Sequence, residues 1–301
     1  MTDRHAARLG ALMCTLSAAC YAGLSILGKV ALASGLTLTG MLSLRFLGAA
    51  AVLAVLLLLQ RRSIPLASST GLRLLMLGGL LYAPQAALFF SGLQRLPASV
   101  AVLLLYVYPV IVAVFDWVFN HRPPDRRIVL ALAMATIGVA LTLYPQPTTE
   151  VDPLGAVLVL TSATGLSVYI ILSERATRVA GARLGALGVV LGAGLSFTLA
   201  GAAGGTLEWR TAATQPWLLL GLIVIGTVLP VTLFLAGVGR VGPTAASLLS
   251  TLEPVFTVAL GAVVLGESLV PLQWLGGGLI LAAGLLVATR PSPAAEASPT
   301  M

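Results

Sequence analysis

The stretch "LFFSGLQRLPASVAVLLLYVYPV", residues 88–110, returns 145 residues later as "LFLAGVGRVGPTAASLLSTLEPV", residues 233–255. Nine of the 23 aligned positions are identical without a gap, and they include Gly92/Gly237, Arg95/Arg240 and Pro109/Pro254. Apolar composition alone produces matches of Leu and Ala, but not a shared Gly, Arg and Pro at one spacing. The same offset extends toward the start of each copy at Gly10/Gly155 and Ser17/Ser162. The chain therefore contains an internal repeat.

Composition places both copies in a membrane. Of the 301 residues, 58% are hydrophobic and only 9% are charged, with a mean hydropathy of +1.02. Soluble domains carry about 25% charged residues, and apolar stretches of about 20 residues, each long enough to cross the hydrocarbon core, recur from end to end. We therefore predict an all-α integral membrane protein with ten transmembrane helices, at residues 9–32, 39–59, 72–93, 97–119, 128–146, 153–173, 184–205, 216–236, 243–265 and 271–289.

Each copy of the repeat contains five of these spans. An odd number of crossings makes the second copy enter the membrane from the opposite side, which produces two inverted five-helix repeats. The predicted units are residues 1–145 and 146–290, followed by a disordered cytoplasmic tail at 291–301.

The basic residues orient the chain. With both termini in the cytoplasm, most Lys and Arg residues lie in cytoplasmic segments, and those outside are Lys29, Arg95 and Arg210. This asymmetry follows the positive-inside rule. The net charge of +7 is thus explained by membrane topology and does not indicate a nucleic-acid partner. We expect a multi-pass protein of the cell (inner) membrane, as a monomer or weak homodimer.

The fourth span of each copy carries the clearest family pattern. It reads "ASVAVLLLYVYPVIVAVF" at 98–115 and "AASLLSTLEPVFTVALGAVVLGE" at 245–267. With the doubled five-helix repeat, these motifs resemble the EamA-like ten-helix branch of the drug/metabolite transporter superfamily. The first copy departs from the pattern, because Arg122 stands where a Glu is usual and only Glu267 completes "LGE". The resemblance implies helices arranged around a central cavity and secondary export of amino acids or other small metabolites.

The sequence carries no motif for an enzyme, a metal or a cofactor. The two histidines, His5 and His121, lie in segments outside the predicted spans, and a phosphate-binding Gly-x4-Gly-Lys-Ser/Thr loop is absent from the sequence. We predict a secondary active or facilitative exporter that moves small molecules by alternating access. Two alternatives stay open: a carrier of phosphorylated sugars or lipid-linked intermediates, and a membrane scaffold that transports nothing.

Glu253 is the most informative residue, because a carboxylate at bilayer depth costs about 2.5–3.5 kcal/mol. Its repeat counterpart is Tyr108, so the repeat does not require an acid there. Glu253 either ties helices together or serves as a site for a proton or a substrate ammonium group. Arg45, inside the second span, either pairs with Glu253 or binds a carboxylate. Asp116 is expected to pair with Arg73 or Arg126.

Prolines interrupt the third and fourth spans of both copies. Inside a span, a proline removes a backbone hydrogen bond and weakens the helix where a solute is held or a bundle bends. We predict hinges or kinks at Pro84, Pro109, Pro230 and Pro254.

The candidate substrate-binding residues are mostly aromatic or amide in character. They are Tyr21, Ser25, Tyr82, Gln85, Tyr106, Tyr108, Thr164, Tyr169 and Arg45. Such walls reward apolar area and penalise an unpaired charge. The sequence therefore favours neutral amino acids, hydrophobic or aromatic, as substrates.

Overall fold

A computed structural model describes residues 2–61, 68–96, 98–142, 152–207, 215–265 and 271–288. The regular structure of these residues is helical throughout, which confirms the predicted fold class. The helices are α1 (Thr2–Ala33), α2 (Leu38–Leu59), α3 (Ser69–Met76), the π-helix η1 (Leu77–Tyr82), α4 (Ala83–Leu93), α5 (Ala98–Leu105), α6 (Tyr108–Asn120), α7 (Arg126–Thr142), α8 (Pro153–Ala180), α9 (Ala182–Ala203), α11 (Pro216–Ile223), the π-helix η2 (Val224–Val228), α12 (Leu229–Val241), α13 (Pro243–Ser250), α14 (Glu253–Leu265) and α15 (Pro271–Ala288).

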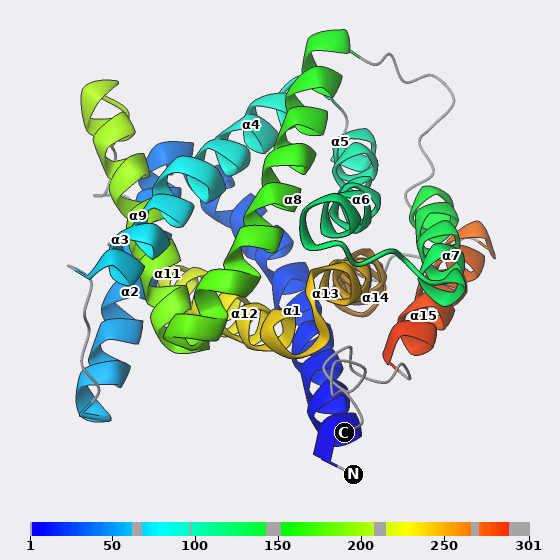
Figure 1. Cartoon of the computed structure of the whole chain (residues 1–301). Coiled ribbons are helices and arrows are strands. Elements are labelled where there is room, and N and C mark those ends of the chain that lie inside the picture. Colours follow the sequence, from blue (N-terminus) through cyan, green and yellow to red (C-terminus); the bar gives the residue numbers. More distant parts are fainter. Residues whose placement is uncertain are drawn as a thin grey trace.

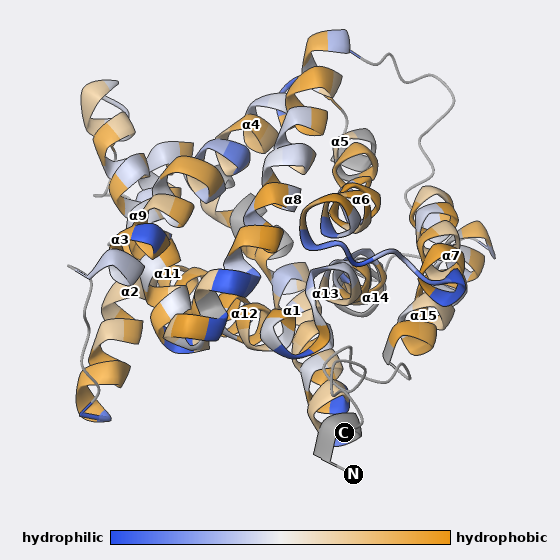
Figure 2. Cartoon of the chain, viewed as in Figure 1, coloured by the Kyte–Doolittle hydropathy of each residue, from blue (hydrophilic) through white to orange (hydrophobic). Residues whose placement is uncertain are grey.

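The helices form a single bundle with one repeat-related pair at each edge (Figure 1). The second helix of each copy, α2 and α9, lie together on one side, while the fifth helices, α7 and α15, lie together on the other. Between them, α1 packs against α12, and α8 packs against α4. Hydrophobic residues recur along the helices (Figure 2), as expected for a protein whose solvent is lipid.

The helix boundaries reproduce the sequence repeat. Adding 145 to the bounds of α5 and α6 gives the bounds of α13 and α14, residues 243–250 and 253–265. The hydrogen bonds between helices follow the same rule. Ser17 in α1 donates to the backbone carbonyl of Pro230 at 2.8 Å, and Ser162 in α8 donates to that of Gln85 at 2.7 Å. Both donors and both acceptors are 145 residues apart, so a pseudo-two-fold axis relates the two halves.

Close backbone contacts repeat in the same way. A Cβ added at Gly10 would lie 2.7 Å from Arg240 Cβ, and one added at Gly155 would lie 3.0 Å from Arg95 Cβ. Glycine is needed at both places because α1 crosses α12, and α8 crosses α4, at a distance that leaves no room for a side chain.

Seven helical stretches among the described residues are long and apolar enough to cross a bilayer. They are His5–Leu24, Leu38–Leu59, Ser69–Leu93, Leu103–Asn120, Pro153–Ala180, Ala182–Ala203 and Pro216–Val241, and Trp274–Val287 is a shorter apolar helix. The helices of the first and sixth predicted spans are longer than predicted. The first, α1, begins at Thr2, and the sixth, α8, continues to Ala180. Hydropathy marks where the hydrocarbon ends, whereas a helix continues into the polar region as long as its backbone hydrogen bonds persist.

The fourth span of each copy consists of two helical segments separated by a short break near its proline. The helix stops at Leu105 and resumes at Tyr108, and its counterpart stops at Ser250 and resumes at Glu253. The proline at the second residue of each new segment, Pro109 or Pro254, lacks the N–H that would join it to the preceding turn. In the third spans, the π-helices η1 and η2 end just before Pro84 and Pro230. Every predicted kink proline therefore adjoins a helix irregularity.

Candidate functional site

Five helical segments bring an arginine and five aromatic rings together inside the bundle. We call Tyr21, Arg45, Phe46, Tyr82, Tyr169 and Phe197 the aromatic cluster; they come from α1, α2, η1, α8 and α9. The ring centroids of Tyr82 and Tyr169 are 5.0 Å apart, and those of Phe46 and Tyr82 are 5.7 Å apart in an edge-to-face arrangement. Phe197 stacks on Phe46 at 6.0 Å. These spacings are those of favourable aromatic pairs.

Arg45 is the charged member of this cluster. Its side chain is 5% exposed, and its Cζ lies 4.2 Å from the centroid of the Phe46 ring. The phenol groups of Tyr82 and Tyr21 are its electrostatic neighbours. Its Nε is buried without a hydrogen-bond partner, and the ion pairs among the described residues do not include it. The cluster thus has a cation but no counter-ion.

A second polar group forms at the two helix breaks. We call Tyr106, Tyr108, Ser247, Ser250 and Glu253 the break cluster. The Tyr106 and Tyr108 rings are 5.9 Å apart, and the Tyr108 hydroxyl donates to the Ser247 carbonyl at 3.3 Å. The Glu253 carboxylate is an electrostatic neighbour of the Tyr106 hydroxyl. Because Glu253 is the first residue of α14, the helix break determines where its side chain lies.

Arg45 and Glu253 are not paired in this structure. The polar neighbour of Glu253 is the phenol of Tyr106, and the neighbours of Arg45 are the phenols of Tyr82 and Tyr21. The two clusters meet α1 at different levels, since Cys14 neighbours Tyr108 and Tyr21 belongs to the aromatic cluster. Seven helical residues separate these positions, a rise of roughly 10 Å. Arg45 and Glu253 therefore occupy two separate sites.

The remaining candidates lie elsewhere or have other partners. Gln85 accepts hydrogen bonds from Ser162 through both its backbone carbonyl and its Oε1, at 2.7 and 3.0 Å, so its amide is engaged between α4 and α8. Thr164 is exposed and donates to Leu160 in its own helix. The side chain of Ser25 lies outside the described residues. The structure thus brings Tyr21, Tyr82 and Tyr169 together with Arg45, places Tyr106 and Tyr108 in the separate break cluster, and leaves Thr164 outside both.

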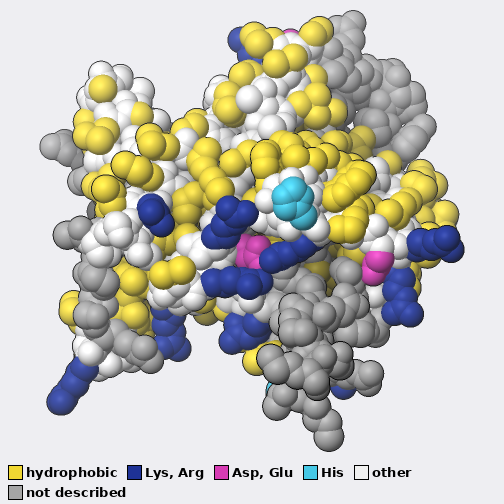
Figure 3. Space-filling view, viewed as in Figure 1, with side chains coloured by type: hydrophobic (Ala, Val, Ile, Leu, Met, Phe, Trp, Pro, Cys, Tyr) yellow, Lys and Arg dark blue, Asp and Glu magenta, His cyan; other side chains and the backbone are white. Residues whose placement is uncertain are grey.

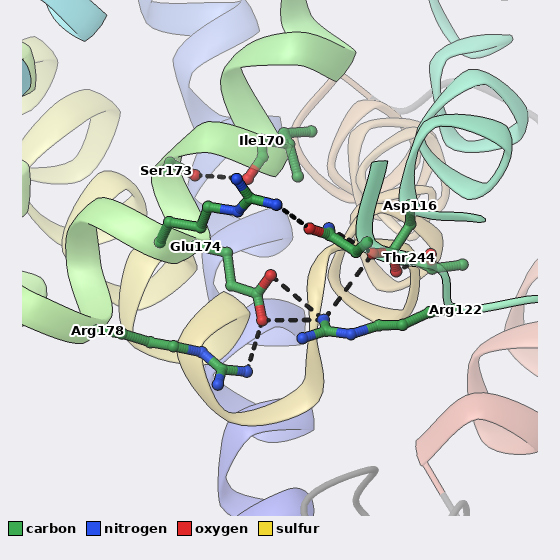
Figure 4. Close-up of polar contacts among 9 residues, drawn as sticks. Asp116, Arg122, Ile170, Ser173, Glu174, Arg178 and Thr244 are labelled. Atoms are coloured by element: carbon green, nitrogen blue, oxygen red, sulfur yellow. Dashed lines mark hydrogen bonds and ion pairs between the residues drawn. The ribbon is translucent and has the colours of Figure 1, made fainter. Parts of the chain in front are cut away.

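An ion-pair network joins α6, α8 and α13 at one end of the bundle (Figure 4). Glu174 is 2% exposed and accepts from Arg178 at 2.6 Å and from Arg122 at 3.1 and 3.3 Å. Asp116 accepts from Thr244 at 2.8 Å and lies 3.8 Å from Arg122. Figure 3 shows basic side chains gathered around an acidic one on this face. The predicted partners of Asp116, Arg73 and Arg126, were wrong, because the end of α6 returns Arg122 toward its own helix.

Sequence reasoning missed this network, although the repeat offers a signal for it. Arg122 aligns with Glu267, and Glu174 aligns with Lys29. Two charge reversals at corresponding positions indicate that residues 122 and 174 form a pair. Glu267 and the Lys29 side chain themselves lie outside the described residues.

A simpler ion pair lies at the start of α8. Arg95 Nη1 contacts Asp152 Oδ2 at 3.1 Å, and Asp152 also accepts from the Leu154 N–H at 2.8 Å, capping the helix. The pKa of Asp152 is lowered below its usual value, mainly by the hydrogen bond from Arg95 and to a smaller extent by the one from the Leu154 N–H. Both side chains are substantially exposed. The described part of the chain gathers no group of three His, Cys, Asp or Glu residues that could hold a metal.

An inverted repeat of membrane helices with polar clusters at broken helices defines a carrier of small solutes. The sequence matches the EamA-like transporter family over residues 8–144 and again over 153–289. The chain belongs to the EamA-like transporter family, within the drug/metabolite transporter superfamily; it is a multi-pass membrane transporter and not an enzyme.

Curated relatives support this membership. The chain is 29% identical over 210 residues to the threonine/homoserine exporter RhtA of Escherichia coli K12, covering 69% of this chain and 67% of RhtA. It is 25% identical over 254 residues to the uncharacterized inner membrane transporter YedA of the same organism, covering 82% and 80%. A solved crystal structure superposes with a TM-score of 0.79 at 18% identity, covering 92% of this chain and 95% of the other, which is a likeness of fold.

Proposed function

We propose that this protein exports neutral amino acids, hydrophobic or aromatic ones in particular, across the inner membrane by alternating access. The observation that carries the proposal is the contrast between a symmetric scaffold and an asymmetric interior. The repeat counterparts of Tyr21, Arg45, Tyr82 and Tyr169 are Leu166, Val190, Thr227 and Leu24. In the other copy of the repeat, helices pack at the equivalent positions without a guanidinium or a phenol. The guanidinium of Arg45 and the three phenols therefore serve a bound solute.

The aromatic cluster suits an amphipathic solute of modest size. Aromatic rings provide apolar contact area, and each buried Å² contributes about 25 cal/mol. The phenol hydroxyls and Arg45 supply the few polar groups that orient a ligand in a mostly apolar site. In the break cluster, Glu253 serves the coupling proton or the substrate ammonium group. The similarity to a threonine/homoserine exporter supports amino acids as the substrate class.

A carrier of sugar phosphates is the second candidate within transport. A dianionic phosphate requires several cations, and Arg45 is the one basic side chain in the aromatic cluster. That composition favours a ligand with a single negative group.

The test is transport by the purified protein in liposomes. Radiolabelled phenylalanine, threonine, alanine, glutamate and glucose 6-phosphate are compared by counterflow. We expect flux of the neutral amino acids above that of glutamate and the phosphate ester. Tyr82→Ala should reduce phenylalanine flux about tenfold and alanine flux less, because the ring that it removes contacts the larger substrate. Equal losses would assign Tyr82 to packing, and preference for glucose 6-phosphate would exclude the amino-acid proposal.

The proposed orientation has its own test. With both termini cytoplasmic, reporter fusions after residues 35, 65, 150 and 180 should report outside, inside, outside and inside. A cytoplasmic signal from the fusion after residue 150 would reverse the proposed direction of insertion.

A further inference from the structure

Arg45 is placed where a charged side chain is costly. It is the eighth residue of α2, so it lies roughly 10 Å along the helix from its first residue. A cation at such depth is unfavourable unless an anion, a water-filled space or a helix end compensates it. Thr37 caps the N-terminus of α2, and its hydroxyl accepts from the Gly40 N–H at 3.1 Å. This helix end carries positive dipole charge and therefore does not compensate the Arg45 cation.

Among the described residues, the ion pairs do not supply the guanidinium with an anion. Phe46 offers the face of its ring, and Tyr21 and Tyr82 offer neutral phenol groups. Arg45 Nε has no hydrogen-bond partner, in contrast to Arg122 and Arg178, which both reach Glu174. An unpaired buried polar group of this kind is rare in stable proteins and is retained where function needs it.

The repeat provides an internal comparison. The residue equivalent to Arg45 is Val190, which is 0% exposed in α9. Because α2 and α9 pack against each other around the pseudo-two-fold axis, the same fold accommodates an apolar side chain at this position. The arginine is therefore not required to assemble the α2–α9 pair.

We propose that Arg45 binds the carboxylate of the transported amino acid. This inference rests on the proposed function and assigns one group of that substrate to one residue. A guanidinium presents paired N–H donors that match a carboxylate in geometry and charge. The single cation is neutralised by a single negative group, and the partly exposed ring of Tyr82, packed on Tyr169, offers apolar contact to the substrate side chain. A bound carboxylate supplies a counter-ion to Arg45.

Two measurements on purified protein test the assignment. Phenylalanine should raise the thermal unfolding temperature of the wild type. Phenylalaninamide, which has the same ring and ammonium group but no carboxylate, should need at least a tenfold higher concentration for the same rise. Arg45→Met should lose the response to phenylalanine, and Arg45→Lys, which keeps the charge but not the paired donors, should retain part of it. The second measurement uses no ligand. Arg45→Met should unfold at the same temperature as wild type or higher, because it removes an uncompensated charge.

Arg122→Met is the matched control, since its guanidinium is paired with Glu174; it should unfold at a lower temperature. Equal stabilisation of wild type by phenylalanine and its amide, or an undiminished response in Arg45→Met, would overturn the carboxylate assignment while leaving amino-acid export intact. A marked loss of ligand-free stability in Arg45→Met would also overturn it, by showing that the guanidinium supports packing. If wild type responds to no amino acid, the proposed function itself fails.

Discussion

Replacing Gly237 by alanine tests the close helix contacts that relate the two halves. Gly237 lies in α12 against α1, where a Cβ would overlap Cys14 Sγ and lie 3.0 Å from the Gly10 carbonyl oxygen. Its repeat counterpart, Gly92 in α4, would place a Cβ 2.5 Å from Val159 Cγ2 and 2.9 Å from the Gly155 carbonyl oxygen. In both cases the obstacle includes backbone of the neighbouring helix, which cannot rotate away. The helices must separate.

The magnitude follows from two opposing terms. Overpacking a well-packed interior costs about 1–3 kcal/mol. Gly→Ala in a helix recovers roughly 0.8–1.0 kcal/mol through propensity. Gly237→Ala and Gly92→Ala should therefore each destabilise the protein by up to about 2 kcal/mol, after both terms are combined. Gly239→Ala is the matched control in the same helix, because no atom lies within 4 Å of its added Cβ, and it should leave stability unchanged or slightly increased.

Reversible unfolding in mixed micelles with increasing dodecyl sulfate, followed by helical circular dichroism, measures these free energies. Two results would refute the reasoning. Gly237→Ala as stable as Gly239→Ala would show that α1 and α12 do not approach this closely. Strong destabilisation by Gly237→Ala with no effect of Gly92→Ala would show that the two contacts are not equivalent.

Three further predictions address the site and the helix contacts. Glu253→Gln should remove the pH dependence of transport while the protein stays folded, because it deletes the carboxylate of the break cluster; an unchanged pH profile in liposomes would leave Glu253 a structural role. Glu174→Gln should lower the thermal unfolding temperature because it removes the buried carboxylate that pairs with two arginines, whereas Asp152→Asn, at an exposed pair, should change it little; the reverse order would contradict this account. Ser17→Ala and Ser162→Ala should each cost about 0.6 kcal/mol, typical of hydrogen bonds between membrane helices, and clearly unequal losses in dodecyl sulfate unfolding would argue against their equivalence.

Much of the architecture could be predicted from the sequence because the bilayer imposes simple rules. A helix that crosses hydrocarbon needs about 20 apolar residues, so composition reveals the crossings. The repeat at 145 residues and the odd number of spans per copy then predict the inverted relation. The observed reciprocity of Ser17 with Pro230 and of Ser162 with Gln85 agrees with that register. Prolines likewise marked the places where the third and fourth helices become irregular.

The tertiary structure decided what the polar residues contact. A sequence shows that Arg45, Glu253 and Asp116 are unusual in an apolar chain, but not which helix faces meet. The rotation of each helix about its axis and the way α6 ends after Asn120 placed Arg122 beside Glu174 and left Arg45 among phenol rings, away from Glu253. These orientations depend on packing between helices that are distant in sequence. Hydropathy fixes how far a helix extends through the bilayer, whereas its neighbours fix the direction in which each side chain points.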